Sequence, residues 1–205
     1  MKRLAILGAS GHGKVVAEIA ELCGWNEIHF YDDNWPAVST NGPWNVLGNT
    51  EGLVKNSNAY NGVIVAIGSN SIRYDKSMCL ISQGFNLTTL IHPFATVSGY
   101  SEIGQGCVVM AGAVINPFVK IGAASIVNTS ATVDHDCTIG HGVHIGPGVN
   151  VAGTVIIGAL TWLGIGSSIK QCISIGCQVV VGAGAVVVNN ISDGLTVVGI
   201  PARAV

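Results

Sequence analysis

The sequence predicts an α/β plus all-β protein: a small, Rossmann-like parallel α/β domain over residues 1–91, then a parallel β-helix with a C-terminal tail over residues 92–205. Two observations carry this prediction. Aliphatic residues recur at every sixth position from Val97 to Val187, and residues 1–91 alternate short apolar runs with helical patterns. The two parts therefore have different periodicities, which favours two domains.

The elements of the first domain follow from its apolar runs and turn residues. Residues 3–8 form an apolar run typical of a buried strand, and a glycine-rich turn and an amphipathic helix follow it. A second strand over residues 28–31 ends at Asp32-Asp33, and residues 34–50, rich in proline, glycine and tryptophan, are expected to form an ordered loop. The later expected elements are a short helix near 51–56, a strand at 62–68, a helix at 71–83 and a strand at 86–91.

The turn Gly8-Ala9-Ser10-Gly11-His12-Gly13 lies where a strand passes into a helix. Such a turn presents free backbone N–H groups to an anion, assisted by the helix dipole. An acidic residue, Asp32 or Asp33, follows about 20 residues later, as in dinucleotide-binding folds. The domain is too short to hold the second half of an NAD site, so phosphate groups of a smaller nucleotide fit the turn better. A tight turn without a ligand is the alternative.

The repeat of the second part covers sixteen consecutive hexapeptides without a slip. A small or modest side chain precedes each aliphatic residue by two positions, and glycine often follows it, as in Ile139-Gly140. We expect the aliphatic residue to point inward, the small residue to fit a corner, and the glycine to supply backbone freedom for the turn. Three hexapeptides make one coil of 18 residues, so the repeat predicts about five coils.

Composition excludes several classes of protein. The formal net charge is -2, which argues against a nucleic-acid partner, and no apolar run reaches membrane length. The sequence starts directly with a strand pattern rather than a signal peptide, and its six cysteines contain no CxxC pair, so we expect a cytoplasmic protein with free thiols. Only 10% of the residues are charged, which predicts that part of the solenoid is buried against copies of itself.

Several motifs together resemble the NeuD/PglD-type sugar acetyltransferases, which are left-handed β-helix, hexapeptide-repeat acyltransferases. These motifs are Gly8–Gly13, Tyr31-Asp32-Asp33, Ile67-Gly68-Ser69-Asn70 with Arg73, and Asn128-Thr129 with Asp134-His135-Asp136-Cys137. The resemblance runs nearly from end to end. It implies a homotrimer that acetylates the 4-amino group of a UDP- or dTDP-linked 4-amino-4,6-dideoxy sugar with acetyl-CoA. In the NeuD branch the acceptor is sialic acid, and O-acetylation of this or another sugar is the alternative activity.

The same resemblance assigns substrate contacts in the first domain. Asp32 or Asp33 would contact the nucleoside, and the turn with Gly11 and Gly13 would hold the diphosphate. His12 would lie near the substrate, although a solvent-exposed loop histidine is the alternative. Ser69, Asn70 and Arg73 complete the implied substrate-binding set.

His135 is the candidate general base of the β-helix, because a neutral imidazole can take a proton from an attacking amine. Asp134 and Asp136 flank it, and either carboxylate could fix the tautomer of the ring. The family places an acidic residue, usually Glu, directly after this histidine, and this chain has the shorter Asp136. A histidine that merely occupies a surface turn is the alternative.

The 18-residue coil predicts which residues lie next to His135. Gly153 follows by one coil, so its N–H is expected beside the ring, where it could donate to the thioester oxygen. His144 follows by half a coil and should lie on the far side of the same prism, so that only a neighbouring subunit could bring it to His135. By resemblance His144 contacts the coenzyme, which would bind between subunits.

The resemblance also places Asn128 near the amino group of the sugar, with an inward-facing asparagine ladder as the alternative. Coenzyme A is expected to pass Ile165-Gly166 and Gly182-Ala183, where missing side chains let it approach the backbone. His141 has no counterpart in the family and is interpreted as a surface residue.

Two other classes of β-helix protein are alternatives to an acetyltransferase. Some β-helix trimers hold zinc through an H-x4-H pair plus an earlier histidine, and the spacing of His135, His141 and His144 does not supply this set, so no metal is expected. A purely structural solenoid would have no need for the His-Asp pair or for the nucleotide-like domain.

Overall fold

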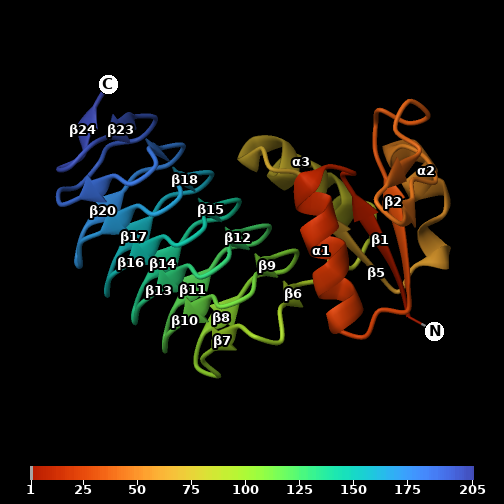
Figure 1. Cartoon of the computed structure of the whole chain (residues 1–205), viewed down its shortest axis with the longest axis horizontal. Coiled ribbons are helices and arrows are strands. Elements are labelled where there is room, and N and C mark those ends of the chain that lie inside the picture. Colours follow the sequence, from red (N-terminus) through yellow and green to blue (C-terminus); the bar gives the residue numbers. More distant parts are fainter. Residues whose placement is uncertain (1) are drawn as a thin grey trace. The chain divides into compact units, whose positions relative to one another are not determined.

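The structure is a computed structural model that describes residues 2–205, and the chain divides into two compact units between His92 and Pro93 (Figure 1). Each unit has its own hydrophobic core. Among the described residues, no helix is both long enough and apolar enough to cross a membrane.

The N-terminal unit is built on a parallel sheet in the order β2-β1-β5, with β1 (Arg3–Leu7), β2 (Glu27–Tyr31) and β5 (Gly62–Val65). Every residue of β5 and four of the five in β1 are buried, as expected for strands covered on both faces. The other elements are α1 (Gly11–Leu22), α2 (Thr50–Lys55), the 3-10 helix η1 (Ser57–Ala59), α3 (Asn70–Ser82) and β6 (Leu90–Ile91).

Two segments of this unit differ from the sequence-based expectation. The loop expected over residues 34–50 contains a hairpin of β3 (Thr40–Asn41) and β4 (Trp44–Asn45), whose two-residue strands are too short to show a periodicity. The ring of Trp44 packs 5.9 Å from that of Phe30 on β2. The strand expected over residues 86–91 is reduced to β6 and an isolated bridge between Val63 and Leu87.

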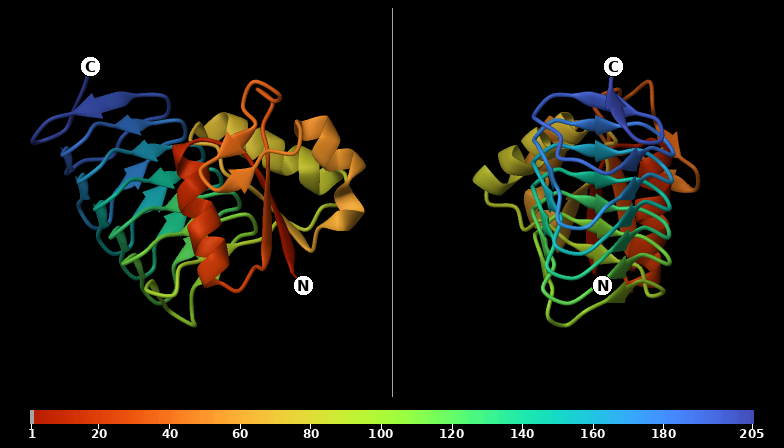
Figure 2. Two further views of the ribbon diagram at one scale, coloured as in Figure 1. Left: turned by 45° about the vertical axis from the view of Figure 1, so that its right-hand side comes forward. Right: turned by 90° about the vertical axis from the view of Figure 1, so that its left-hand side faces the viewer.

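The second unit is a parallel β-solenoid whose coils carry one short strand on each of three faces (Figure 2). The first face stacks β7 (Thr96–Val97), β10 (Val114–Ile115), β13 (Thr132–Val133), β16 (Asn150–Val151), β19 (Ser168–Ile169) and β22 (Val186–Val187). The second stacks β8 (Glu102–Ile103), β11 (Lys120–Ile121), β14 (Thr138–Ile139), β17 (Ile156–Ile157) and β20 (Ser174–Ile175). The third includes β9 (Val108–Val109), β12 (Ile126–Val127), β15 (His144–Ile145), β18 (Trp162–Leu163), β21 (Val180–Val181) and β23 (Thr196–Val198).

Neighbouring strands pair in parallel with a register shift of 18 residues, as in Val133 opposite Val151. The aliphatic residue of each hexapeptide from Val109 to Val187 is buried and contributes to one continuous core. Cys107 and Cys137 are buried free thiols at corners of this core. The first face holds six strands, so the solenoid is about one coil longer than the five expected from the repeat.

The glycine that follows the aliphatic residue does not supply the turn, contrary to the expectation from the sequence. Left-handed backbone occurs three positions after the aliphatic residue, and non-glycine residues fill many of these positions, among them Phe118 (φ 63°) and Asp136 (φ 60°). A left-handed conformation costs a non-glycine residue about 1–2 kcal/mol. Gly140 has no such φ, but a Cβ there would lie 2.6 Å from the backbone N of Ala159. Close stacking of successive coils, rather than backbone freedom, therefore requires glycine at this position.

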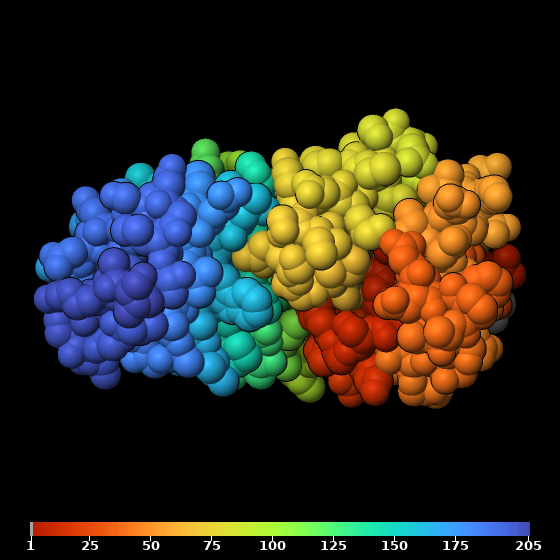
Figure 3. All heavy atoms as spheres, turned by 90° about the horizontal axis from the view of Figure 1, so that it is seen from above, coloured from red at the N-terminus to blue at the C-terminus, as the bar shows by residue number. Residues whose placement is uncertain are grey.

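The C-terminal tail crosses the end of the solenoid and hydrogen-bonds to all three faces. On the second face Ile191 N donates to Ser174 O at 3.0 Å, and on the first Ala202 N donates to Val186 O at 2.8 Å. On the third face β23 pairs with β21, and β24 (Arg203–Ala204) adds to β23 in antiparallel orientation. The space-filling view shows these last residues, in blue, clustered at one end of the solenoid (Figure 3). The tail thus satisfies backbone groups on the last coil.

Candidate active site

The glycine turn between β1 and α1 is shaped by two close approaches. Gly8 has a φ of 115°, and a Cβ there would lie 2.7 Å from Ala66 O. A Cβ on Gly13 would lie 2.4 Å from Gly8 O, so the first turn of α1 packs tightly on the end of β1. Around Gly11 there is open space. The first N–H groups of α1, which have no partner within the helix, are therefore presented at the carboxyl end of the sheet.

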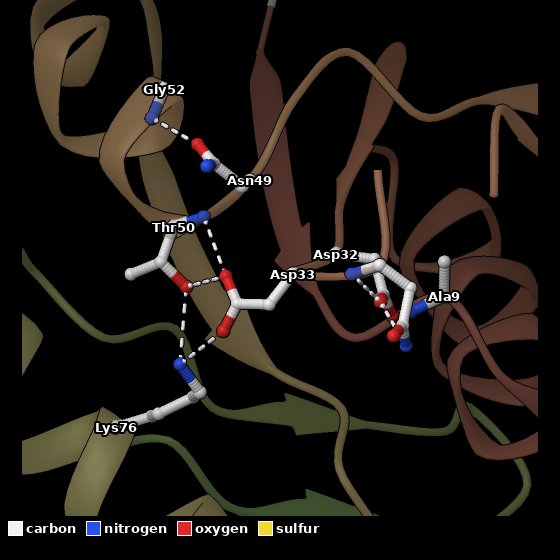
Figure 4. Close-up of polar contacts among 8 residues, drawn as sticks. Ala9, Asp32, Asp33, Asn49, Thr50, Gly52 and Lys76 are labelled. Atoms are coloured by element: carbon white, nitrogen blue, oxygen red, sulfur yellow. Dashed lines mark hydrogen bonds and ion pairs between the residues drawn. The ribbon is translucent and has the colours of Figure 1, made fainter. Parts of the chain in front are cut away.

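Asp32 and Asp33 point in different directions from the end of β2 (Figure 4). Asp32 accepts hydrogen bonds from Ala9 N at 2.8 Å and from Asn34 N at 2.9 Å, which ties the glycine turn to β2. Asp33 accepts from Thr50 N and Oγ1 at 2.9 and 2.6 Å and pairs with Lys76 Nζ at 2.7 Å. Partial burial alone would raise the pKa of Asp33, but the hydrogen bonds from Lys76 and Thr50 outweigh it and lower this pKa to about 2.

A pocket of about 340 Å³ opens at this end of the sheet. Its volume is within the range of small-molecule sites, and its position at the carboxyl ends of parallel strands is the usual one for a ligand in such a sheet. Ile72 and Lys76 in its wall were not predicted from the sequence, although their four-residue spacing places them on one side of a helix. The lining residues are Leu7, Gly8, Ser10, Asp32, Asp33, Asn34, Ile67, Ile72 and Lys76.

Of the other residues assigned to substrate binding, Arg73 is buried, His12 is half-buried and Ser69 is exposed. Arg73 is 1% exposed, and its guanidinium donates to Ile67 O at 3.0 Å and to Asn70 Oδ1 at 2.9 Å. Ser69 precedes α3, with its hydroxyl 3.4 Å from that of Ser71. His12 is half-buried, and burial, with the charge of Arg73 as a smaller cause, lowers its pKa to about 4, so its ring is neutral near pH 7. Contact of these residues with a substrate stays a prediction.

In the solenoid, His135 lies at the corner between β13 and β14 with a carboxylate on either side. Asp136 Oδ2 lies 2.7 Å from His135 Nδ1, whereas Asp134 Oδ1 accepts from the backbone N of His135 and from Asn116 Nδ2, both at 2.8 Å. Asp136 therefore orients the ring and Asp134 holds the turn. The hydrogen bond to Asp136, followed by the charge of Asp134, raises the pKa of His135 above its ordinary value.

Gly153 occupies the equivalent corner of the next coil and lies directly against the His135 ring. A Cβ on Gly153 would be 2.7 Å from both Cε1 and Nε2 of His135. Thr154 N donates to His135 O at 2.9 Å, which fixes the two corners together. The predicted neighbourhood of His135 and Gly153 is thus present, and the role of the Gly153 N–H stays a prediction.

His144 lies on β15, on the face opposite the His135 corner, as half a coil of separation predicts. It is 9% exposed, its Nε2 lies 3.0 Å from Asn128 Nδ2, and its ring stacks on Trp162 with centroids 5.1 Å apart. The sequence reasoning did not predict this contact between His144 and Asn128. Asn128 is half-buried, and the residues one coil before and after it are Met110 and Gly146, so it forms no asparagine ladder.

The residues expected along the coenzyme lie at the corner between the third and first faces. Ile165 is 59% exposed, and Gly166, with a φ of 68°, has nothing within 4 Å of an added Cβ. Gly182 packs more closely, since a Cβ there would lie 2.8 Å from Val198 Cγ1, and Ala183 follows it on the same corner. Their contact with coenzyme A stays a prediction.

A shallow groove of about 400 Å³ crosses the first face, between the His135 corner and the corner that carries Ile165 and Gly166. Asn116, Thr132, Asp134, Asn150 and Ser168 supply its polar groups, and Val114, Val151, Ala152 and Ile169 supply its apolar surface. Within residues 2–205, no group of three histidine, cysteine, aspartate or glutamate side chains is arranged to hold a metal ion.

Comparisons with known proteins agree on one relationship. Residues 3–78 match the model of the PglD N-terminal domain. The UDP-N-acetylbacillosamine N-acetyltransferase of Bacillus subtilis (strain 168) is 35% identical over 114 residues, which span 54% of this chain and 52% of that protein, so about half of each is compared. The structure superimposes on the acetyltransferase domain of PglB from Neisseria gonorrhoeae FA1090, solved with acetyl coenzyme A, with a TM-score of 0.96, 43% identity and coverage of 100% and 99% of the two chains. PerB from Caulobacter crescentus, solved with CoA and GDP-perosamine, has a TM-score of 0.95, 35% identity and coverage of 100% and 98%.

Proposed function

This chain belongs to the NeuD/PglD-like family of sugar acetyltransferases, and we propose that it transfers the acetyl group of acetyl-CoA to the 4-amino group of a nucleotide-linked 4-amino-4,6-dideoxy sugar. The relatives support the reaction class, because one was solved with acetyl-CoA and another with CoA and an amino sugar nucleotide. The observation that carries the proposal for this chain is the exposed His135–Asp136 pair. The His135 ring lies directly against Gly153, which has no side chain.

The His135–Asp136 pair has the arrangement expected of a general base. When Nδ1–H of His135 donates to Asp136 Oδ2, the lone pair of Nε2 is free to accept a proton from the attacking amine. Asp136 then stabilises the imidazolium, consistent with the raised pKa of His135. Direct attack requires no covalent enzyme intermediate, so this one base and a suitable oxyanion donor suffice.

The reaction would proceed through one tetrahedral intermediate. The amine nitrogen bonds to the thioester carbon, the carbonyl electron pair moves onto oxygen, and His135 Nε2 takes the proton from nitrogen. Among the described residues no acceptor receives the Gly153 N–H, so this group can donate to the oxyanion. When the C–S bond breaks, the imidazolium returns the proton to the leaving thiolate of coenzyme A.

We assign the nucleotide of the acceptor to the pocket at the carboxyl end of β1, β2 and β5. The glycine turn and the start of α1 suit a diphosphate, and Asp32, Asp33 and Lys76 supply charged and hydrogen-bonding groups for a nucleoside. UDP or dTDP was expected from the family resemblance. The PerB complex contains GDP-perosamine, so a guanine nucleotide belongs in the same test.

We further propose a homotrimer in which acetyl-CoA binds between subunits. His144 and Asn128 lie away from the His135 corner of their own prism, so an adjacent subunit would bring them to it. In this arrangement coenzyme A would run past Ile165-Gly166 and Gly182-Ala183, whose corner has exposed backbone.

The test is thiol release from acetyl-CoA in the presence of UDP-, dTDP- and GDP-linked 4-amino-4,6-dideoxy sugars and of free sialic acid. His135→Ala should abolish release, whereas His141→Ala, at a different corner of the solenoid, should retain it. Turnover with only sialic acid would make the protein an O-acetyltransferase and contradict the nucleotide assignment. No turnover with any acceptor would contradict the proposed reaction.

A further inference from the structure

An aromatic pair that the proposed reaction does not use lies on the surface of the solenoid. Tyr100 is 74% exposed and Phe118 is 60% exposed, and their ring centroids are 5.7 Å apart at an interplanar angle of 36°. Large aromatic side chains gain most from burial, so two that contact each other in solvent indicate a surface that packs against something else.

The pair shares a corner with the His135–Asp136 pair. Tyr100, Phe118 and Asp136 are 18 residues apart and lie at equivalent positions between the first and second faces. Two hydrogen bonds join the corner of Phe118 to that of His135: Asp136 N donates to Pro117 O at 3.2 Å, and Asn116 Nδ2 donates to Asp134 Oδ1 at 2.8 Å. Because coils are spaced by about 4.8 Å, the aromatic rings begin one coil from the proposed base.

The backbone of Phe118 has the left-handed conformation that is general at this corner, where Asp136, Thr154 and Cys172 adopt it too. Its φ is 63°, a left-handed conformation that is unfavourable for a bulky side chain. Glycine occupies the same position of the repeat at other corners, for example at Gly112 and Gly148. Phe118 recovers little through burial, since most of its side chain is in solvent. The fold of the corner therefore imposes this φ, and the exposure of the two aromatic rings, not the φ of Phe118, indicates a binding surface.

We propose that Tyr100 and Phe118 form a stacking surface for the apolar face of the acceptor sugar and so position its amine at His135. This inference rests on the proposed function. A pyranose ring presents C–H groups on one face, and a 6-deoxy sugar has a methyl group where other hexoses carry a hydroxymethyl group. Aromatic rings bind such a surface through dispersion and exclusion of water, without hydrogen bonds that would compete for the amine.

The test compares Phe118→Gly, Tyr100→Ser and the double variant with wild type in the thiol-release assay. Glycine accepts the left-handed φ at residue 118, so the fold is expected to tolerate this change. Gln178→Gly is the matched control, because Gln178 is exposed and has a φ of 55° at a different corner. We expect the double variant to raise the KM of the amino sugar nucleotide about tenfold or more. The KM of acetyl-CoA and the inhibition constant of the free nucleoside diphosphate should not change, because neither ligand contains the sugar.

The outcomes separate this inference from the function on which it rests. An active wild type with an acceptor KM unchanged in the double variant overturns the stacking surface alone. An equal rise in the inhibition constant of the nucleoside diphosphate also overturns it, by assigning the rings to the nucleotide. A changed molar mass in light scattering overturns it in favour of a subunit contact. A wild type that acetylates no amino sugar nucleotide overturns the proposed function and this inference together.

Discussion

Replacing Gly153 with alanine tests whether catalysis requires a residue without a side chain next to the His135 ring. The added Cβ would lie 2.7 Å from Cε1 and Nε2 of the His135 ring. Carbon atoms in ordinary contact are about 3.5–4.0 Å apart, so the ring would have to move by about 1 Å. Because the ring is exposed and held mainly by Asp136, it can move without unfolding the solenoid.

The expected loss follows from this displacement. A shift of about 1 Å in a catalytic group reduces the rate about 100-fold, equivalent to about 2.7 kcal/mol in the activation free energy. The thermal unfolding midpoint should change little. Gly153 does not have a left-handed φ, so alanine fits its backbone and even restricts the unfolded chain.

The assay is the initial rate of thiol release at varied acceptor, together with thermal unfolding followed by circular dichroism. Gly99→Ala is the matched control, since Gly99 holds the same corner position three coils earlier and an added Cβ there meets nothing within 4 Å. If Gly153→Ala kept kcat/KM within threefold of wild type, the close contact with His135 would not matter for catalysis and the reasoning would be refuted.

Three other outcomes are expected. Asp136→Asn removes the main cause of the raised pKa of His135, so the acidic limb of the kcat/KM profile should move to lower pH and the maximum fall about tenfold; an unmoved limb would contradict this. Gly140→Ala forces a Cβ onto the backbone of the next coil and should lower the free energy of unfolding by about 1–3 kcal/mol in urea titrations. The pKa of Asp33 is lowered in the fold, so its pair with Lys76 stabilises the protein above about pH 4 and ceases to do so as the pH falls through about 2. Lys76→Met should therefore cost up to about 1 kcal/mol at pH 7, as both side chains are partly exposed, and the difference should vanish in unfolding experiments near pH 2.

Much of the fold was predictable because the length of the repeat determines the geometry of the coil. An 18-residue coil fixes which side chains stack, and it placed Gly153 beside His135 and His144 on the opposite face. The role of the glycines was not predictable in the same way. Some glycines are needed because a neighbouring coil leaves no room for a Cβ, and others lie where the backbone is left-handed; the sequence does not distinguish the two. Phe118 shows that a non-glycine residue can also adopt the left-handed conformation.

The candidate site was predictable as a set of residues and less so as a set of contacts. Both aspartates beside His135 were plausible partners, and only the direction of each side chain distinguishes the one on the ring from the one on the backbone. Lys76 was missed because a single lysine on a helix carries no motif, although it pairs with Asp33 in the pocket. The hairpin over residues 40–45 was missed because two-residue strands have no detectable pattern.

The C-terminal tail has a consequence for assembly. A stack of parallel strands is an open template, since its last coil offers backbone donors and acceptors to any further strand, as in the growth of a fibre. Here Ile191, β23 and Ala202 occupy those groups, and the reversed direction of β24 interrupts the parallel pattern. The tail therefore blocks the addition of further parallel strands and ends the solenoid after its last coil.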